Sequence, residues 1–175
     1  MTTSLDVILI GGASHVGKSR IAAQLAERLG WCCLSTDDLG RHPGRPWEAQ
    51  SEAVQEMYQT LSAETLHWLL RIHHQTIWPS IEQRLAEARI GGQPIVLEGN
   101  ALRPELMHKQ MMVGTRAVCL AAPEALLRDR IWTTSGHDQA STDLRGRVRS
   151  FLGRSLIDNK VMAQAAQRHG VEMIN

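Results

Sequence analysis

The chain has little of what marks a secreted protein or a nucleic-acid-binding protein. Its 175 residues include only three cysteines, Cys32, Cys33 and Cys119, which are too few and too unevenly spaced for a disulfide framework or a four-ligand zinc site. An excess of one sign of charge is also lacking, because the chain has 19 Lys and Arg residues and 18 Asp and Glu residues. The formal net charge of +1 therefore gives no overall reason to expect a nucleic-acid or membrane partner.

Long apolar runs are lacking as well. The N-terminal stretch MTTSLDVILIGGAS carries Asp6 where a signal peptide has positive charge, and its apolar run is short. This stretch fits neither a secretory signal nor a membrane span. No repeat or low-complexity tract is found, and 43% apolar with 21% charged residues is ordinary globular composition. We expect one soluble, cytoplasmic domain over residues 1–175, as a monomer or a homodimer.

What the chain does have is an alternation of short apolar runs with helical patterns. Three runs bounded by turn residues predict buried strands over Asp6–Ile10, Pro94–Leu97 and Thr115–Leu120. Weaker patterns add strands over Trp31–Leu34 and Val171–Ile174. Strands that alternate with helices imply right-handed crossovers and a mainly parallel sheet. The sequence therefore predicts an α/β fold, a three-layer α/β/α sandwich around a five-stranded sheet.

The helical patterns lie between these strands. An apolar stripe predicts a helix from Lys18 to Leu29, directly after the first strand. The region of about 40–92 is strongly helical, but Pro79 is expected to interrupt it, with a further helix over Ser80–Ile90. Another helix is expected over Leu156–Arg168. In such folds ligands bind outside the carboxyl ends of the strands.

One motif at such a strand end carries a specific chemistry. The stretch Gly12-Ala13-Ser14-His15-Val16-Gly17-Lys18-Ser19 matches G-x-x-x-x-G-K-[ST] completely and lies between a predicted strand and a predicted helix. Inward-turned backbone N–H groups and the N-terminus of the helix favour a phosphate there. Lys18 is expected to contact the outer phosphates of ATP, and Ser19 to offer its hydroxyl to Mg²⁺.

Other segments narrow the class of phosphate-binding protein. A guanine-specific switch carries N-K-x-D, but Asn159-Lys160 is followed by Val161-Met162. A motor ATPase usually has an apolar strand that ends in Asp-Glu, whereas this chain has Ile95-Val96-Leu97-Glu98-Gly99. We therefore favour a transferase.

The sequence resembles the small-molecule kinases of the P-loop class, which include nucleoside monophosphate kinases and the shikimate, gluconate and chloramphenicol kinases. The resemblance rests on the glycine loop GGASHVGKS, on LSTDDLGR, IVLEGN and VCLAAPEALLRDR, and on the basic stretch STDLRGRVRSFLGR, in this order. STDD combined with LEG also resembles kinases of 2-phosphoglycerate and zeta-toxin-like proteins. The resemblance implies a single domain with the P-loop NTPase fold of the kinase type. It further implies a helical substrate-binding insert over about 40–92 and a lid-like segment over about 128–154.

The resemblance also implies roles for acidic residues at the strand ends. In members that phosphorylate hydroxyls, a carboxylate after the second strand orients the acceptor, and Asp37 or Asp38 occupies that place. Glu98 stands where relatives carry an acidic residue that reaches Mg²⁺ or the substrate. The ordinary alternatives are that the aspartates cap a helix and that Glu98 lies in a surface turn. Nucleotide-phosphorylating relatives grip the acceptor phosphate with arginine, which Arg41 or Arg45 would do here.

The basic stretch, with its interleaved glycines, resembles the mobile lid of the group. Arginines of a closing lid neutralise the charge that develops on the transferred phosphoryl group. Arg128 and one of Arg145 or Arg147 are expected to contact phosphate or substrate, and the remaining arginines to form a solvated face. Arg103 is expected either to bind an anionic substrate group or to lie solvated at the surface.

Together these residues predict an ATP- and Mg²⁺-dependent phosphotransferase that acts on a hydroxyl of a small molecule. Lys18, Asp37 and Arg128 are the expected catalytic residues, and Ser19 and Glu98 the expected magnesium ligands. Two alternatives stay open at this point, a nucleoside or nucleotide kinase and a nucleotide-binding regulatory module without transfer activity.

Overall fold

A computed structural model of the chain describes residues 6–40, 43–48 and 50–175. Its described part contains a five-stranded sheet of order β2-β3-β1-β4-β5, in which every pair of neighbours is parallel. The expected α/β sandwich is confirmed. The strands are β1 (Val7–Gly12), β2 (Cys32–Ser35), β3 (Ile95–Glu98), β4 (Thr115–Leu120) and β5 (Glu172–Ile174).

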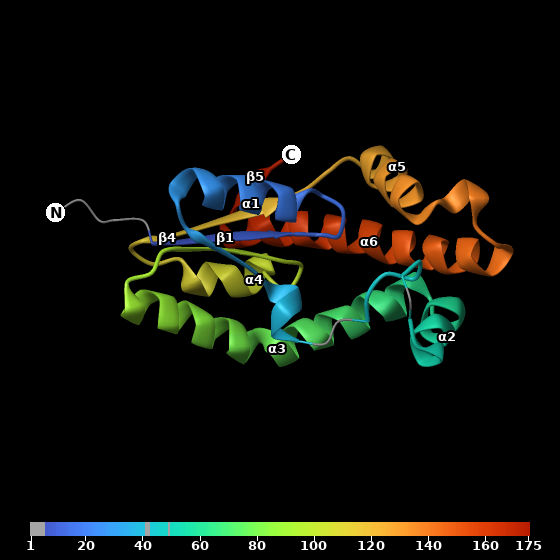
Figure 1. Cartoon of the computed structure of the whole chain (residues 1–175), viewed down its shortest axis with the longest axis horizontal. Helices are drawn as coiled ribbons and strands as arrows, with labels where there is room; N and C mark the ends of the chain where they lie inside the picture. Colours follow the sequence, from blue (N-terminus) through green and yellow to red (C-terminus); the bar gives the residue numbers. More distant parts are fainter. Residues whose placement is uncertain (1–5, 41–42, 49) are drawn as a thin grey trace.

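Helices connect these strands and cover both faces of the sheet. In Figure 1, α1 lies on one side of the sheet and α3 on the other, while α2 and the N-terminal half of α6 extend beyond its end. Within the described ranges, no helix has the length and apolar character needed to cross a membrane. The helices are α1 (Lys18–Leu29), α2 (Glu52–Thr60), α3 (Ala63–Gly91), α4 (Pro104–Met107), α5 (Glu124–Ser135) and α6 (Thr142–His169), with 3₁₀ turns η1 (Thr36–Leu39), η2 (His108–Gln110) and η3 (His137–Gln139).

The side chains of β1 divide the core between the two faces of the sheet, because successive residues of a strand point to opposite sides. Val7 and Leu9 pack against α3, α4 and the C-terminal half of α6. Ile8 and Ile10 pack against α1 and α5. A third apolar cluster lies outside the sheet, where α2 and the start of α3 meet α5 and the N-terminal half of α6. This cluster builds a wall beyond the strand ends.

The expected break at Pro79 is wrong, because α3 runs without interruption from Ala63 to Gly91. A proline inside a helix removes one backbone hydrogen bond, which normally kinks or ends the helix. Here Ile77 and Ile81 are buried and hold the helix against the sheet on both sides of the proline. Pro79 has no N–H to donate to the carbonyl oxygen of Gln75. Both residues are exposed, so water hydrogen-bonds to that carbonyl oxygen instead.

The last helix is longer than expected, since α6 begins at Thr142 rather than at Leu156. Most of the lid-like segment is therefore helical, with Gly146 and Gly153 inside α6, whereas Gly136 ends α5 with a φ of 61°. Gly146 has open space around it, whereas a Cβ on Gly153 would lie 3.0 Å from the Cβ of Ala63. Gly153 thus allows α6 to approach α3 closely.

Gly99, directly after β3, brings the strand end against η1. Its φ is +155°, and a Cβ there would lie 1.7 Å from Thr36 Oγ1 and 2.7 Å from Thr36 Cβ. Gly99→Ala is therefore expected to lower the free energy of unfolding by about 2–5 kcal/mol, because backbone strain and overpacking add. Urea unfolding followed by tryptophan fluorescence measures the loss.

Gly146→Ala is the matched control for this substitution. Since Gly146 is helical and has nothing within 4 Å of the added Cβ, the free energy of unfolding is expected to rise by up to ~1 kcal/mol. Equal midpoints for the two variants would contradict the close packing of Gly99.

Candidate active site

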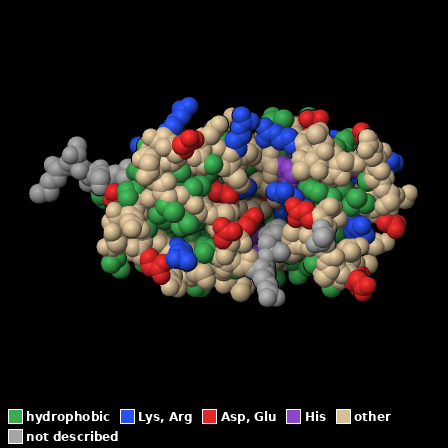
Figure 2. Space-filling view, in the orientation of Figure 1, with side chains coloured by type: hydrophobic (Ala, Val, Ile, Leu, Met, Phe, Trp, Pro, Cys, Tyr) green, Lys and Arg blue, Asp and Glu red, His purple; other side chains and the backbone are tan. Residues whose placement is uncertain are grey.

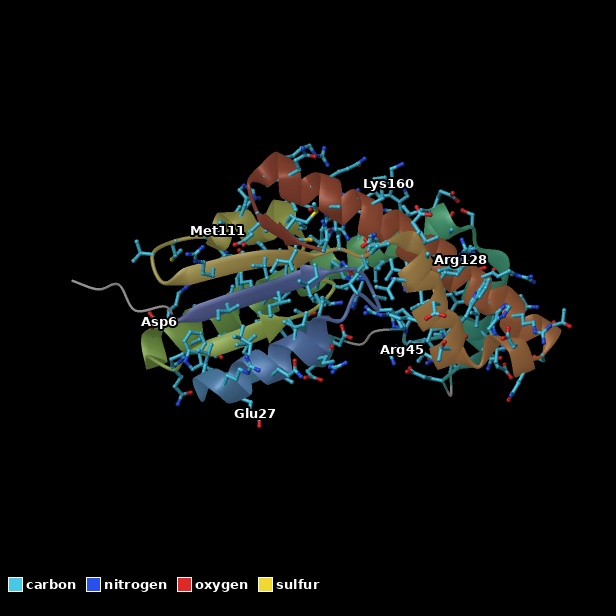
Figure 3. All side chains as sticks on the ribbon, turned by 90° about the horizontal axis from the view of Figure 1, so that it is seen from above. Asp6, Glu27, Arg45, Met111, Arg128 and Lys160 are labelled. Atoms are coloured by element: carbon cyan, nitrogen blue, oxygen red, sulfur yellow. The ribbon has the colours of Figure 1, made fainter. Side chains whose placement is uncertain are left out.

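The carboxyl ends of three neighbouring strands meet at one edge of the sheet. The register places both Ile10 of β1 and Ser35 of β2 beside Glu98 of β3. Figure 3 shows Asp6, which precedes β1, near one end of the sheet and Arg45 near the other. The chain segments that follow β1, β2 and β3 are therefore brought together, as the sequence predicts.

A cavity of about 510 Å³ opens at this edge. Figure 2 shows a hollow near the middle of one face, with acidic, basic and histidine side chains around it. The walls come from the glycine loop and the start of α1, from η1 and the segment after it, from the end of β3, and from α5 and α6. The lining residues are Ser14, His15, Gly17, Lys18, Ser19, Arg20, Asp37, Gly44, Arg45, Glu48, Glu98, Gly99, Asn100, Arg130 and Phe151.

The glycine loop presents a buried cation to this cavity. Helix α1 begins at Lys18 itself, and Gly17 forms the N-cap with a φ of 108°. Lys18 is 8% exposed, and its ammonium donates to the carbonyl oxygen of Ala13 at 2.8 Å. Burial lowers the pKa of Lys18, while the carboxylates of Glu98 and Asp37 act against this. Burial disfavours the charged form of Lys18 unless an anion lies nearby. A phosphate group in the loop would be such an anion, so the geometry fits a nucleotide phosphate.

Two oxygen groups stand beside the loop. The Ser19 hydroxyl donates to Glu98 Oε1 at 3.0 Å, and Glu98 is 6% exposed. Glu98 is the last residue of β3 and does not belong to the turn that follows. The alternative that it lies in a surface turn is therefore wrong. Oxygen ligands of this kind suit Mg²⁺, which keeps several waters and shares phosphate oxygens. In the described ranges, no group of three or more His, Cys, Asp or Glu residues forms a metal site made of protein alone.

The two candidate aspartates follow β2 within η1, and their surroundings differ. Asp37 lines the cavity, whereas Asp38 does not. The Ser35 side chain caps this turn by accepting a hydrogen bond from the backbone N–H of Asp37 at 3.3 Å. The capping role is therefore filled by a serine. Asp37 faces Lys18 and Glu98 across the cavity, and Asp38 lies outside it.

The arginine of α5 that reaches the cavity is Arg130. It lines the cavity and donates from Nη1 to the carbonyl oxygen of His15 in the glycine loop at 2.9 Å. Arg128, two residues earlier, is exposed, and its Cζ lies 5.4 Å from the centre of the Trp132 ring. The structure thus brings Arg130, and not Arg128, beside the glycine loop.

Arg45, one of the two arginines expected to hold an acceptor phosphate, lines the cavity, whereas Arg103, Arg145 and Arg147 do not. Arg145 donates to backbone carbonyls of η3, and the Nε atom of Arg147 is buried with no hydrogen-bond partner in the described ranges. Arg103 is 1% exposed and donates to Asp158 Oδ1 at 2.7 Å, so the expected solvated position is wrong. Arg41 lies outside the described residues.

Several lining residues were not assigned from the sequence. Asn100 is 7% exposed, and neither atom of its side-chain amide has a partner in the part of the chain described. The His15 ring packs edge-on against Trp47 and Phe151, with ring centres 5.7 and 5.8 Å apart. Asn100 could have been suspected from its place two residues after Glu98. Phe151 gives no local signal, because it reaches the cavity from far along the chain.

The surroundings of His15 predict a dependence of stability on pH. Burial, and then the nearby charges of Arg45 and Lys18, lower the pKa of His15 from 6.5 to about 4. Between these values the unfolded chain binds more protons than the folded chain, so falling pH favours unfolding. Wild type is therefore expected to lose stability more steeply than His15→Asn as pH falls from 6.5 to 4.

Urea titrations at pH 7, 6 and 5 measure this difference. Asparagine is the suitable replacement because His15 has a φ of 66°, a left-handed conformation that asparagine tolerates. Parallel stability curves for the two proteins would mean that His15 is freely protonated in the folded state.

Two curated proteins are similar to the chain along most of its length. It is 24% identical over 183 residues to a 2-phosphoglycerate kinase from Methanocaldococcus jannaschii. It is 27% identical over 188 residues to a 2-phosphoglycerate kinase from Methanothermobacter thermautotrophicus. Each alignment covers 96% of this chain, but only 57% and 60% of the respective relative. The chain thus spans less than two thirds of the length of these relatives.

A solved structure and a family profile agree with the observed topology. A gluconokinase from Sinorhizobium meliloti 1021 superposes with a TM-score of 0.50 at 20% identity, over 95% of this chain and 94% of the other. This likeness concerns the fold. The profile of the AAA domain family matches residues 7–152, from β1 through the glycine loop to the middle of α6. The chain therefore belongs to the AAA domain family and has the P-loop fold found in small-molecule kinases.

Proposed function

We propose that the protein is an ATP- and Mg²⁺-dependent kinase that transfers the γ-phosphoryl group of ATP to a hydroxyl of a small molecule. The observation that carries this proposal is the composition of one cavity, which has Lys18 and Ser19 on one wall and Asp37 on another. Phosphoryl transfer depends mainly on positioning and on neutralisation of negative charge. A cavity with a phosphate-binding lysine and an opposed carboxylate offers both.

The nucleotide side of the cavity has residues for each part of the cosubstrate. Bound Mg²⁺-ATP supplies the transferable phosphoryl group. The backbone amides of the glycine loop and the Lys18 ammonium hold the phosphates, and Ser19 and Glu98 hold the metal ion directly or through water. Arg130 adds a positive charge beside the loop, where it stabilises negative charge on the phosphates.

The acceptor side of the cavity begins at Asp37. This exposed carboxylate accepts a hydrogen bond from the acceptor hydroxyl, orients it and takes its proton as the new bond forms. Arg45 and Asn100 line the same space and offer a positive charge and an amide to the rest of the acceptor. A small polar molecule with a hydroxyl group suits this lining.

A panel of acceptors tests the proposal. The purified protein is incubated with Mg²⁺-ATP and 2-phosphoglycerate, gluconate, shikimate or deoxynucleosides, and ADP release is measured. The names of the two archaeal relatives make 2-phosphoglycerate the first acceptor to test. Turnover of a hydroxy acid supports the proposal, and turnover of nucleosides alone supports the alternative of a nucleoside kinase. Tight ATP binding without turnover of any acceptor supports a regulatory module.

A further inference from the structure

His15 is an unusual residue of the glycine loop, because it carries a side chain in a backbone conformation that glycine adopts more easily. Its φ is 66°, and it is the one non-glycine residue with a positive φ in the described ranges. Residues held in this left-handed conformation cluster at functional sites. Neither nitrogen of the ring has a hydrogen-bond partner among the described residues. The packing of the ring is therefore what distinguishes histidine from glycine at this position.

Three rings from distant parts of the chain meet at this position. The His15 ring packs edge-on against Trp47, which belongs to the segment 43–48, and against Phe151 of α6. Trp47 and Phe151 also pack edge-on against each other, with ring centres 5.0 Å apart. Edge-to-face pairs at such distances attract each other beyond the effect of the area that they bury. The glycine loop is thereby joined directly to α6 and to the segment 43–48.

Phe151 is the fixed member of this group of rings. It is 1% exposed and lies in the apolar cluster beyond the strand ends. Helix α6 is itself held to the segment after β4, because the side-chain amide of Asn159 accepts from the backbone N–H of Ala122 and donates to its carbonyl oxygen. The other two rings therefore lie against a rigid support, and His15 and Trp47 are placed relative to each other.

The segment that carries Trp47 forms one wall of the active-site cavity. Residues 43–48 are called the acceptor wall below, because Gly44, Arg45 and Glu48 line the cavity on the side proposed for the acceptor. The Tyr58 hydroxyl of α2 donates to the carbonyl oxygen of Gly44 at 2.9 Å. Arg45 and Glu48 form an ion pair at 3.2 Å within the wall. Trp47 packs its ring on the glycine loop, so it connects the acceptor side of the cavity with the nucleotide side.

We propose that His15 and Trp47 are positioning residues that hold the acceptor wall against the glycine loop, so that nucleotide and acceptor strengthen each other's binding. The inference rests on the proposed kinase function and names the contact that couples its two substrates. A nucleotide fixes the backbone of the glycine loop around its phosphates. The His15 ring then holds Trp47 and the acceptor wall in place, and an acceptor that meets an ordered wall loses less freedom on binding. The acceptor raises the affinity for nucleotide by the same factor, because coupling is reciprocal.

Hydrogen exchange measured by mass spectrometry tests the coupling without an acceptor. Exchange is compared with and without Mg²⁺ and a non-hydrolysable ATP analogue, and in wild type the analogue is expected to slow it in the glycine loop and in the acceptor wall. His15→Asn tolerates the left-handed φ but has no ring, so only its glycine loop is expected to gain protection. Wild type that gains protection in the loop alone, or a variant that gains it in the wall as wild type does, overturns the inference while the kinase function stands. Protection of neither segment overturns both.

Substitutions of Trp47 separate coupling from simple packing. Trp47→Ala is expected to behave as His15→Asn does, whereas Trp47→Phe keeps a ring and is expected to retain the protection of the acceptor wall by the analogue. Trp68→Ala is the matched control and is expected to respond as wild type does, since Trp68 is 57% exposed on α3 and does not line the cavity. If Trp47 only fills space, Trp47→Ala lowers the Tm but keeps the effect of the analogue on the wall, which overturns the inference.

Calorimetry gives the second measurement once the panel has identified an acceptor. In wild type the analogue is expected to raise the affinity for the acceptor roughly 10-fold, and in His15→Asn to leave it unchanged. The affinity of His15→Asn for the analogue alone is expected to stay close to that of wild type. Equal coupling in the two proteins, or none in wild type, overturns the inference while the kinase function stands. If no acceptor is turned over, the proposed function fails, and hydrogen exchange still decides whether the loop and the wall are coupled.

Discussion

Lys18→Ala is expected to lower kcat/KM for ATP by roughly 10³-fold, as expected when a buried charge that faces transition-state oxygens is removed. Lys18 is 8% exposed, and its ammonium donates to the backbone of its own loop, at Ala13. Within the described ranges its substitution therefore removes no hydrogen bond between distant elements, and the fold is expected to persist. ADP release in the presence of the acceptor measures the loss, and calorimetry with Mg²⁺-ATP measures the accompanying loss of binding.

Lys160→Ala is the control for this substitution. Lys160 is an exposed lysine of α6 that does not line the cavity, so its removal changes the net charge equally without touching the site. A Lys18→Ala variant that keeps more than a tenth of the wild-type kcat/KM would show that the glycine loop does not hold the reacting phosphates. If the far-UV circular dichroism spectrum shows that Lys18→Ala is unfolded, the same measurements are made on Lys18→Met, which keeps the side-chain volume.

The position of the glycine loop in the fold could be predicted because its information is local. Eight consecutive residues determine the loop between β1 and α1, and the parallel sheet then places Asp37 and Glu98 at the same edge. The predicted third strand ends at Leu97, whereas β3 ends one residue later, at Glu98. An apolar pattern ends where a charged residue begins, but β3 continues through Glu98 because this residue pairs with Ile10 on one side and Ser35 on the other.

The choice between the two arginines of α5 could not be made from the sequence. Arg128 and Arg130 flank the buried stripe of Leu127 and Ile131 on opposite sides of the helix. In the helical pattern of the sequence, the two arginines are therefore equally close to the buried face of α5. Which side faces the glycine loop depends on how α5 packs over the sheet, and that packing is set by residues far away in the chain. Arg130 therefore reaches the His15 carbonyl across a long sequence separation.

The start of α6 was predicted too late, at Leu156 instead of Thr142, for a related reason. Glycine lowers the helical propensity of the basic stretch, but a Cβ on Gly153 would lie 3.0 Å from the Cβ of Ala63 in α3, so this glycine permits the close approach of the two helices. Once the segment is a continuous helix, Phe151 and Arg154 lie one turn apart and point to the same side. The wall of the cavity that Phe151 supplies is therefore a product of helix packing, which single-residue patterns do not encode.

Asp37→Asn is expected to lower kcat by roughly 10²–10⁴-fold, the usual contribution of a positioned general base, with the affinity for ATP unchanged. Asparagine keeps the size of the side chain and can still accept a hydrogen bond, but it cannot take the proton of the acceptor hydroxyl. Asp37 is exposed, so the substitution is not expected to change the Tm. Single-turnover measurements with the identified acceptor separate the chemical step from product release.

Asp38→Asn is the discriminating partner, because Asp38 is the next residue of the same turn, carries the same charge and does not line the cavity. Its kcat is expected to stay close to that of wild type. A large loss in both variants would mean that the negative charge of η1, rather than one positioned carboxylate, supports turnover. If Asp37→Asn keeps full activity and Asp38→Asn does not, the acceptor approaches from the outer side of η1, and the cavity described here is not where the transfer takes place.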